Sequence, residues 1–319
     1  MGRCETFLNI VMKINVIFTG GTIGSSHSDG YITPDPAAKY RLIKNYQKAF
    51  GTSVEFTVCN PYTILSENLS GKTLSLLMKS IKEGLEDNCD GIIVAHGTDT
   101  LQYSAIAAAY CFGSNTKPIM FVSANYPLEN PNSNGNLNFE AATEFIKQKV
   151  GKGVYVSYSN DLKSADFHFA LNLLRHEEFD HKVYSLGGRY AIYKNGEILK
   201  NTDFKPKEIK PMGCIEFKEY PEILNITVNP FENYSYDLKG TKAVVFNPYH
   251  SGTLNVMSSA FKEFCTRANN LGIPLYVTGV TEGGEYQSMK EYTDLNIIPV
   301  YGVTSIALLI KLWIDFSKK

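Results

Sequence analysis

Short apolar runs alternate along the chain with stretches of helical spacing. Runs of strand length occur at 14–19 (INVIFT), 91–95 (GIIVA), 118–123 (PIMFVS) and 153–158 (GVYVSY). Residues 73–86 place apolar side chains at 74, 77, 78, 81 and 85, which is typical of an amphipathic helix, and a second helix is predicted over 101–112. Because strands that alternate with helices are joined by right-handed crossovers, this pattern predicts a mainly parallel sheet.

The pattern changes between residues 187 and 213. This stretch is polar, rich in lysine and broken by Pro206 and Pro211, which predicts a hairpin followed by a linker. Beyond it, strands are predicted at 242–247 and 273–279, and helices at 254–271 and 303–316. We therefore expect an α/β fold of two domains. The larger N-terminal domain, with a mainly parallel sheet flanked by helices, is predicted at 12–190, a linker at 191–213 and a smaller C-terminal α/β domain at 214–319.

Composition and charge exclude several classes of protein and several kinds of partner. Hydrophobic residues make up 44% and charged residues 20%, which excludes disordered and collagen-like chains. The 31 Lys and Arg residues balance 32 Asp and Glu residues, so neither nucleic acid nor a membrane surface is an expected partner. No apolar stretch is long enough to predict a transmembrane span. We expect a small-molecule ligand.

The cysteines and the first residues indicate a cytoplasmic protein. The six cysteines form no CxxC pair, and no histidine cluster has metal-ligand spacing, so we predict reduced, mostly buried thiols and no metal site. Residues 1–11 lack the sustained apolar stretch of a signal peptide. Because the first strand follows Met12 almost at once, we predict that Met12 is the natural start.

Two glycine-containing loops follow predicted strands. Loops that leave the carboxyl ends of parallel strands form the ligand crevice of such sheets. The first, at 19–24 (TGGTIG), has paired glycines that allow a sharp turn and close approach to a ligand, and it carries the hydroxyl of Thr22. A plain turn with a capping threonine is an equally good interpretation of this loop alone.

The second loop, at 96–100 (HGTDT), directly precedes a predicted helix. A helix N-terminus offers unpaired N–H groups and partial positive charge, which suit a carboxylate or a developing oxyanion. Thr98 can present a hydroxyl there, and Asp99 can bind an ammonium group. The alternative is that Thr98 or Asp99 is simply the N-cap. We interpret His96 as a packed, hydrogen-bonded histidine and not as a general base.

Taken together and in this order, TGGTIG and HGTDT resemble the L-asparaginase family, which includes related glutaminases, with the cytoplasmic asparaginases as the most similar type. Supporting similarity at 30–31, 66–68, 153–188, 250–253 and 292–306 extends the resemblance over nearly the whole chain from Met12. It implies an amidohydrolase that converts L-asparagine to L-aspartate and ammonia through a threonine acyl-enzyme, with no metal or cofactor.

The resemblance also implies roles for single residues. Thr22 matches the nucleophile, and Tyr31 matches a tyrosine on a mobile loop that helps to activate it. Thr98 and Asp99 match the second threonine and the aspartate that holds the substrate. The implied substrate-binding residues are Ser66, Glu67, Gly21 and Gly97, with glutamine or aspartate at the position of Glu67 in many relatives.

One departure from the family concerns a lysine beside the second threonine. The matching stretch, 170–176 (ALNLLRH), has no lysine, and by position Arg175 is the nearest substitute. An arginine stays protonated, so Arg175 can orient Thr98 or stabilise negative charge but cannot act as a base. His176 can titrate near neutrality, although a structural role is the commoner one for such a histidine.

Several alternatives remain beside the leading hypothesis. A preference for glutamine or another amide is one, and a catalytically impaired protein that only binds a small amino acid is another. The amidase component of the archaeal transamidosome is disfavoured, because that component has an extra N-terminal domain and because we expect no basic face for tRNA on this chain. A dinucleotide-binding fold is excluded, since the G-x-G-x-x-G spacing is absent. The resemblance further implies a homodimer or homotetramer.

Overall fold

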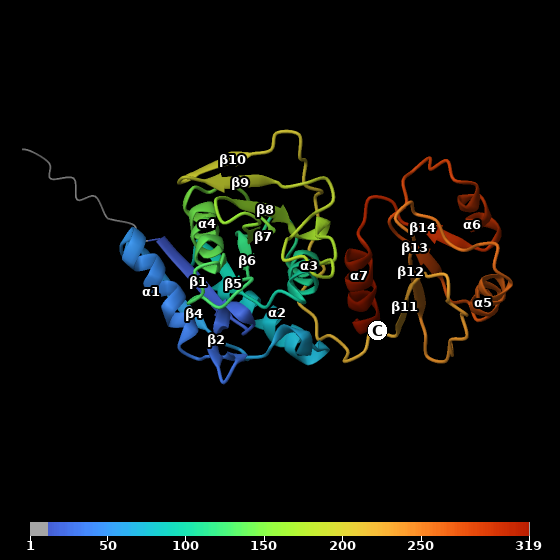
Figure 1. Ribbon diagram of the computed structural model, residues 1–319, viewed down its shortest axis with the longest axis horizontal. Coiled ribbons are helices and arrows are strands. Elements are labelled where there is room, and N and C mark those ends of the chain that lie inside the picture. Colours follow the sequence, from blue (N-terminus) through green and yellow to red (C-terminus); the bar gives the residue numbers. More distant parts are fainter. Residues whose placement is uncertain (1–11, 319) are drawn as a thin grey trace, which may run out of the picture.

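The computed structural model describes residues 12–318, which form a larger mixed sheet and a smaller parallel sheet, each packed with helices and joined by one long connection (Figure 1). The predicted start at Met12 concerns residues 1–11, which lie outside this part of the chain. No helix within 12–318 has both the length and the apolar character needed to cross a bilayer. Of the cysteines in that range, Cys89, Cys111 and Cys265 are buried, whereas Cys59 and Cys214 are exposed.

The larger sheet has eight strands in the order β10-β9-β8-β7-β6-β5-β1-β4. Its parallel strands are β1 (Met12–Phe18), β4 (Val54–Cys59), β5 (Gly91–Ala95), β6 (Ile119–Val122) and β7 (Val154–Tyr158). The antiparallel strands β8 (Ala165–Phe169), β9 (Ala191–Lys194) and β10 (Glu197–Lys200) extend one edge.

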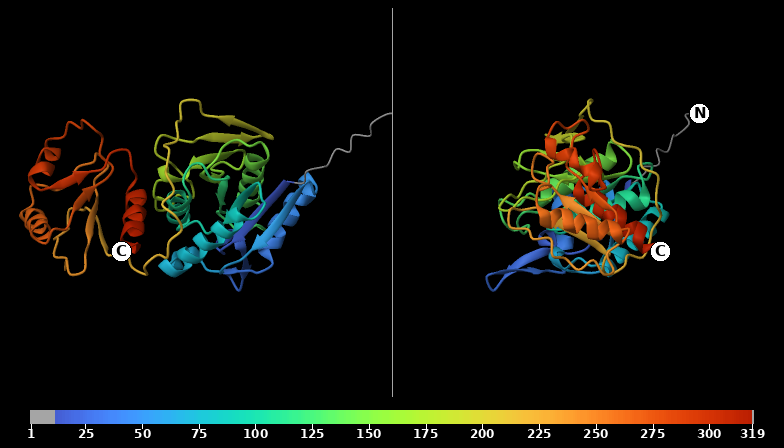
Figure 2. Two further views of the ribbon diagram at one scale, coloured as in Figure 1. Left: turned by 180° about the vertical axis from the view of Figure 1, so that it is seen from behind. Right: turned by 90° about the vertical axis from the view of Figure 1, so that its right-hand side faces the viewer.

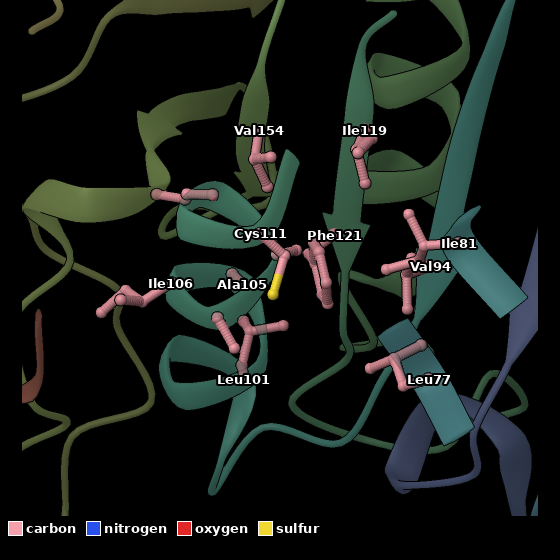
Figure 3. Close-up of a cluster of buried hydrophobic side chains, with 14 of the residues drawn as sticks. Leu77, Ile81, Val94, Leu101, Ala105, Ile106, Cys111, Ile119, Phe121 and Val154 are labelled. Carbon is pink, nitrogen blue, oxygen red and sulfur yellow. The ribbon is translucent and has the colours of Figure 1, made fainter. Parts of the chain in front are cut away.

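Helices cover both faces of this sheet. Helices α2 (Gly71–Glu86) and α3 (Leu101–Phe112) pack on one face, and α1 (Ala38–Phe50) and α4 (Gly135–Lys147) pack on the other. Figure 3 shows side chains of α2 and α3 meeting those of β5, β6 and β7 on the first face. Because both faces are covered, every residue of β5 and β6 is buried, which explains their continuous apolar runs.

The smaller sheet is parallel throughout, in the order β11-β12-β13-β14. Its strands are β11 (Ile223–Thr227), β12 (Ala243–Asn247), β13 (Leu275–Val277) and β14 (Ile297–Pro299). Helices α5 (Ser259–Asn270) and α6 (Glu291–Asp294) contribute to its main core, and α7 (Ser305–Ser317) covers the other face. A two-stranded hairpin of β2 (Ser25–Ser28) and β3 (Tyr31–Pro34) projects from the larger part (Figure 2, right).

Helix α7 lies between the two sheets and joins their cores (Figures 1 and 2). One side of it places Ile306, Ile310 and Ile314 in the core that contains α3, while Leu308 and Leu312 pack against the smaller sheet. A helix that is apolar on both sides must be buried on both sides. The last helix therefore stabilises the contact between the two parts of the chain.

The α/β fold with a larger, mainly parallel sheet and a smaller C-terminal one is confirmed. The predicted hairpin is also present, turning at Asn195 and Gly196 with positive φ at both positions, but its strands belong to the larger sheet. The predicted helix over 254–271 is too long, since α5 begins only after Ser258, whose hydroxyl accepts from the N–H of Phe261. The domain limits at 190 and 214 stay a prediction.

Replacing Ile310 with alanine will lower the free energy of unfolding by about 2–5 kcal/mol, because it leaves a cavity where α7 meets α3. Ile310 is only 1% exposed, whereas Ile298 of β14 is 46% exposed and serves as the control. Urea unfolding of Ile310→Ala and Ile298→Ala measures the difference. Equal losses in the two variants would contradict the role given to α7.

Candidate functional site

The two glycine-containing loops leave neighbouring strands at the point where the strand order reverses. Strand β1 lies between β4 and β5, so the chain moves from β1 to β4 on one side and then crosses to β5 on the other. At such a switch point the connections diverge and leave a crevice outside the carboxyl ends of the strands. The loop 19–24 follows β1 and the loop 96–100 follows β5, so both lie at this switch point, and the surface that they form is called the crevice below.

The loops meet backbone to backbone at Gly21 and Gly97. A Cβ atom placed on Gly21 would lie 2.1 Å from the Cα of Gly97. A Cβ on Gly97 would lie 2.4 Å from the Oγ of Ser66 and 3.0 Å from the Cα of Gly21. No side chain fits at either position, so glycine at both is what lets the two threonine-bearing loops touch. The φ of 72° at Gly21 adds a second reason for glycine there.

A third loop, which follows β4, forms hydrogen bonds with the other two. The N–H of Gly21 donates to the carbonyl of Ile64 at 2.9 Å, and the N–H of Ile64 donates to the carbonyl of Thr19 at 3.1 Å. Further along, the hydroxyl of Thr100 donates to the carbonyl of Ser66 at 2.9 Å. The hydroxyl of Ser66 lies 3.5 Å from Oδ2 of Asp99, a long hydrogen bond. Three loops from three adjacent strands thus form one surface.

Thr98 and Asp99 do not cap helix α3. Its N-cap is Thr100, which makes no side-chain cap bond. The hydroxyl of Thr98 lies instead 2.9 Å from the Oγ of Ser123 and 3.1 Å from the carbonyl oxygen of Ala124. The capping interpretation is therefore wrong for both residues, and Thr98 is fixed by the loop that follows β6. This partner was not predicted from the sequence, although Ser123 was visible as the polar end of an apolar run.

Thr22 begins a single 3-10 turn, η1 (Thr22–Gly24), and is half-buried. The N-cap of this turn is Gly21, without a side-chain cap bond, so Thr22 does not cap it either. Among residues 12–318, nothing accepts a hydrogen bond from the hydroxyl of Thr22 or from the backbone N–H groups of Thr22, Thr98 and Asp99. A hydroxyl and several N–H donors are therefore available at one crevice. Such groups can bind an anion or stabilise a developing oxyanion.

His96 holds the second loop in place. It is 2% exposed, with Nδ1 2.8 Å from the carbonyl oxygen of Gly97 and Nε2 2.9 Å from the Oγ of Ser104. Because a carbonyl can only accept, Nδ1 carries the proton and Nε2 accepts from the hydroxyl of Ser104. Burial lowers the pKa of His96 to about 4, against a smaller opposing effect of the Gly97 carbonyl. The prediction of a packed, hydrogen-bonded histidine is confirmed.

Tyr31 and Glu67 are solvent-exposed and make none of these contacts. Tyr31 is 74% exposed on the hairpin of β2 and β3, whose base is closed by a hydrogen bond from the N–H of Asp35 to the carbonyl of Gly24. Glu67 is exposed in η2 (Ser66–Asn68), next to the buried Ser66. The structure brings together Thr22, Thr98, Asp99, Ser66 and both glycines through their loops, but not Tyr31.

Arg175 is not brought to Thr98. Leu173 is buried against the core of α3, and the chain then turns outward, so that Arg175 is exposed. It lines a cavity of about 280 Å³ together with His250, Thr278 and other residues of the C-terminal part. The next residue, His176, turns back: burial lowers its pKa, and the carboxylates of Asp99 and Asp180 oppose that shift. The electrostatic neighbour of Asp99 in this stretch is therefore His176.

Within residues 12–318, no group of three or more His, Cys, Asp and Glu side chains is placed to hold a metal ion. The available chemistry of the crevice consists of hydroxyls, N–H donors and one carboxylate.

Comparison with known proteins assigns the chain to a family. The family model described as "Asparaginase, N-terminal" matches residues 13–183. A glutamyl-tRNA(Gln) amidotransferase component from Methanococcus maripaludis strain C6 is 32% identical over 222 residues, which are 68% of this chain and 50% of that protein. The corresponding component from Sulfurisphaera tokodaii is 31% identical over 199 residues, 62% of this chain and 43% of that protein. The chain thus spans about half the length of these curated relatives.

Solved structures share the fold. The thermostable L-asparaginase from Thermococcus kodakarensis superposes with a TM-score of 0.78 at 20% identity, covering 97% of this chain and 94% of that one. A probable cytoplasmic L-asparaginase from Campylobacter jejuni gives a TM-score of 0.75 at 19% identity, covering 97% and 96%. At this level of identity the likeness concerns the architecture.

Replacing Gly97 with alanine will lower the free energy of unfolding by about 1–3 kcal/mol, because the added methyl group forces the loops after β1 and β4 to move. Gly97 has no positive φ, so the loss reports packing alone. Gly24→Ala is the matched control, since a Cβ at Gly24 meets nothing within 4 Å. Urea unfolding of both variants measures the effect, and a Gly97→Ala protein as stable as Gly24→Ala would contradict the close contact.

Stability will fall as the pH is lowered from about 7 to 4. The folded-state pKa values of His96 and His168 are lowered to about 4 from 6.5, mainly by burial, so the unfolded chain binds protons that the folded chain does not. Their contribution is complete above the unfolded value and is lost as the pH falls toward 4, amounting to about 3 kcal/mol for each histidine. Unfolding free energies measured across this range will show a slope that His96→Gln reduces. An unchanged slope would contradict the neutral state of His96.

Proposed function

The chain belongs to the asparaginase family, and on this premise we propose that it is an amidohydrolase that cleaves the side-chain amide of L-asparagine through an acyl-enzyme on Thr22. The observation that carries the proposal is the contact of Gly21 with Gly97, which brings the loops of Thr22 and Thr98 to one crevice. A nucleophile, a second hydroxyl and a carboxylate on neighbouring loops are the groups that acyl transfer from a small amino acid requires.

In the proposed reaction, the hydroxyl oxygen of Thr22 attacks the amide carbon and forms a C–O bond. The negative charge that develops on the carbonyl oxygen is stabilised by backbone N–H groups of the crevice, and those of Thr22 and Thr98 have no other acceptor within 12–318. The C–N bond then breaks, and ammonia leaves with the proton that the threonine gave up. Water next attacks the ester, releases L-aspartate and restores the hydroxyl of Thr22.

Asp99 and Ser66 are assigned to holding the substrate. The carboxylate of Asp99 is exposed beside the crevice and suits the α-ammonium group of an amino acid. The hydroxyl of Ser66 is directed to the same carboxylate, and the N-terminus of α3 nearby favours the α-carboxylate. Tyr31 is assigned to activating Thr22 once the hairpin that carries it folds over the crevice.

A second candidate is an amidase that acts on glutamine and supplies ammonia to a partner. The two relatives at 31–32% identity are components of a glutamyl-tRNA(Gln) amidotransferase, whereas the two asparaginase structures compared above are 19–20% identical. The sequence features alone disfavoured this class of enzyme, but these identities make it an alternative. Initial rates of ammonia release from L-asparagine and L-glutamine distinguish the two candidates, and a faster rate with glutamine would favour the second.

Replacing Thr22 with alanine will reduce ammonia release from L-asparagine by at least about 10³-fold, because the covalent route is lost. Thr57→Ala, at an exposed position of β4, is the control and should leave the rate unchanged. Calorimetry with L-aspartate should still detect binding to the Thr22→Ala protein. Equal rates for wild type and Thr22→Ala would overturn the proposal, and binding without any turnover by the wild type would indicate a protein that only binds amino acids.

A further inference from the structure

The hydroxyl of Thr98 has two partners on the loop that follows β6. The Oγ of Ser123 lies 2.9 Å away, and the carbonyl oxygen of Ala124 lies 3.1 Å away. Ser123 is fully buried, so its side chain is closed off from solvent behind Thr98. None of the segments that carry the family resemblance includes this serine.

The direction of these hydrogen bonds follows from the chemistry of the groups. A carbonyl oxygen cannot donate, so the contact with Ala124 uses the single proton of the Thr98 hydroxyl. The hydroxyl of Ser123 must then donate to the Oγ1 of Thr98. The resulting chain runs from Ser123 through Thr98 to Ala124, and it leaves one lone pair of Thr98 free for another donor.

The position of Ser123 is itself fixed. Its carbonyl accepts a hydrogen bond from the side-chain amide of the buried Asn138 at 2.8 Å. The amide oxygen of Asn138 in turn accepts from the N–H of Ser159 at 2.7 Å. Helix α4 therefore ties the ends of β6 and β7 together behind the crevice, and Ser123 has a rigid support.

We propose that Ser123 is a positioning residue, which holds the hydroxyl of Thr98 by donating to its oxygen and so occupies the hydrogen-bonding place that the family resemblance assigns to a lysine. The proposal rests on the proposed function for its kinetic consequences. Arg175 is exposed and His176 is linked to Asp99, which leaves Ser123 as the side chain that contacts the Thr98 hydroxyl within the described range.

A serine donor differs from a lysine donor in charge. It can orient Thr98 and stabilise partial negative charge on its oxygen, but a neutral hydrogen bond is roughly half as strong as a charge-assisted one. The serine hydroxyl also does not titrate in the working range of an enzyme. We therefore expect the loss of Ser123 to lower kcat without changing the shape of its pH profile.

The kinetic test compares Ser123→Ala with Thr143→Ala, which removes another fully buried hydroxyl, one that donates within α4 and does not touch the crevice. With L-asparagine, kcat should fall about tenfold in Ser123→Ala, the factor that one neutral hydrogen bond supplies, and KM should change less than about twofold. Ser123→Cys keeps a weak donor and should give an intermediate kcat. Thr143→Ala should match the wild type.

A double variant separates positioning from general destabilisation. In a Thr98→Ala background, Ser123→Ala should have no further effect on kcat, because the group it orients is gone. An equal further loss in that background, or an unchanged kcat in the single variant, would overturn the inference.

A structural comparison tests the same claim without turnover. In a crystal structure of Ser123→Ala, the Oγ1 of Thr98 should move from its wild-type position, whereas the wild-type crystal structure should keep both contacts. An unmoved Thr98 would overturn the inference whatever the activity. Absence of ammonia release by the wild type would instead overturn the proposed function, so the two failures are distinguishable.

Discussion

The close contact of Gly21 with Gly97 is the constraint on which the crevice depends. A single Cβ atom on Gly21 would approach the backbone of Gly97 to 2.1 Å, so the loops after β1 and β5 can meet only because neither position has a side chain. The reversal of strand order at β1 brings these loops to the same edge, and the loop after β4 fastens both of them. Local sequence and sheet topology thus place Thr22 and Thr98 at one surface although they are remote in the chain.

The polar groups around that contact divide between support and exposure. His96 and Ser123 are buried and bind the second loop from behind, the first as a neutral imidazole and the second as a hydroxyl. Thr22 and the adjacent N–H groups donate no hydrogen bond to any residue within 12–318. Free donors on a loop that buried side chains hold in place are what preorganised electrostatic stabilisation requires.

The fold class and the two loops were predictable from sequence, because continuous apolar runs indicate buried strands and the glycines that follow them indicate tight turns. Helices α1 and α4 were not predicted, nor was Ser123 as the partner of Thr98, since a serine that ends an apolar run gives no sign of what it will face. The family resemblance made Arg175 the nearest substitute for the lysine beside Thr98, but it cannot tell which way the loop turns after Leu173 enters the core. The domain limits, the homo-oligomer and the cytoplasmic location stay predictions.

The most direct measurement of the central claim is a crystal structure of the protein with L-aspartate bound. We predict the amino acid in the crevice at β1 and β5, with its side-chain carboxylate between the hydroxyls of Thr22 and Thr98 and its ammonium group at Asp99. Aspartate bound instead in the cavity lined by Arg175 and His250, with residues 22 and 98 untouched, would contradict that claim.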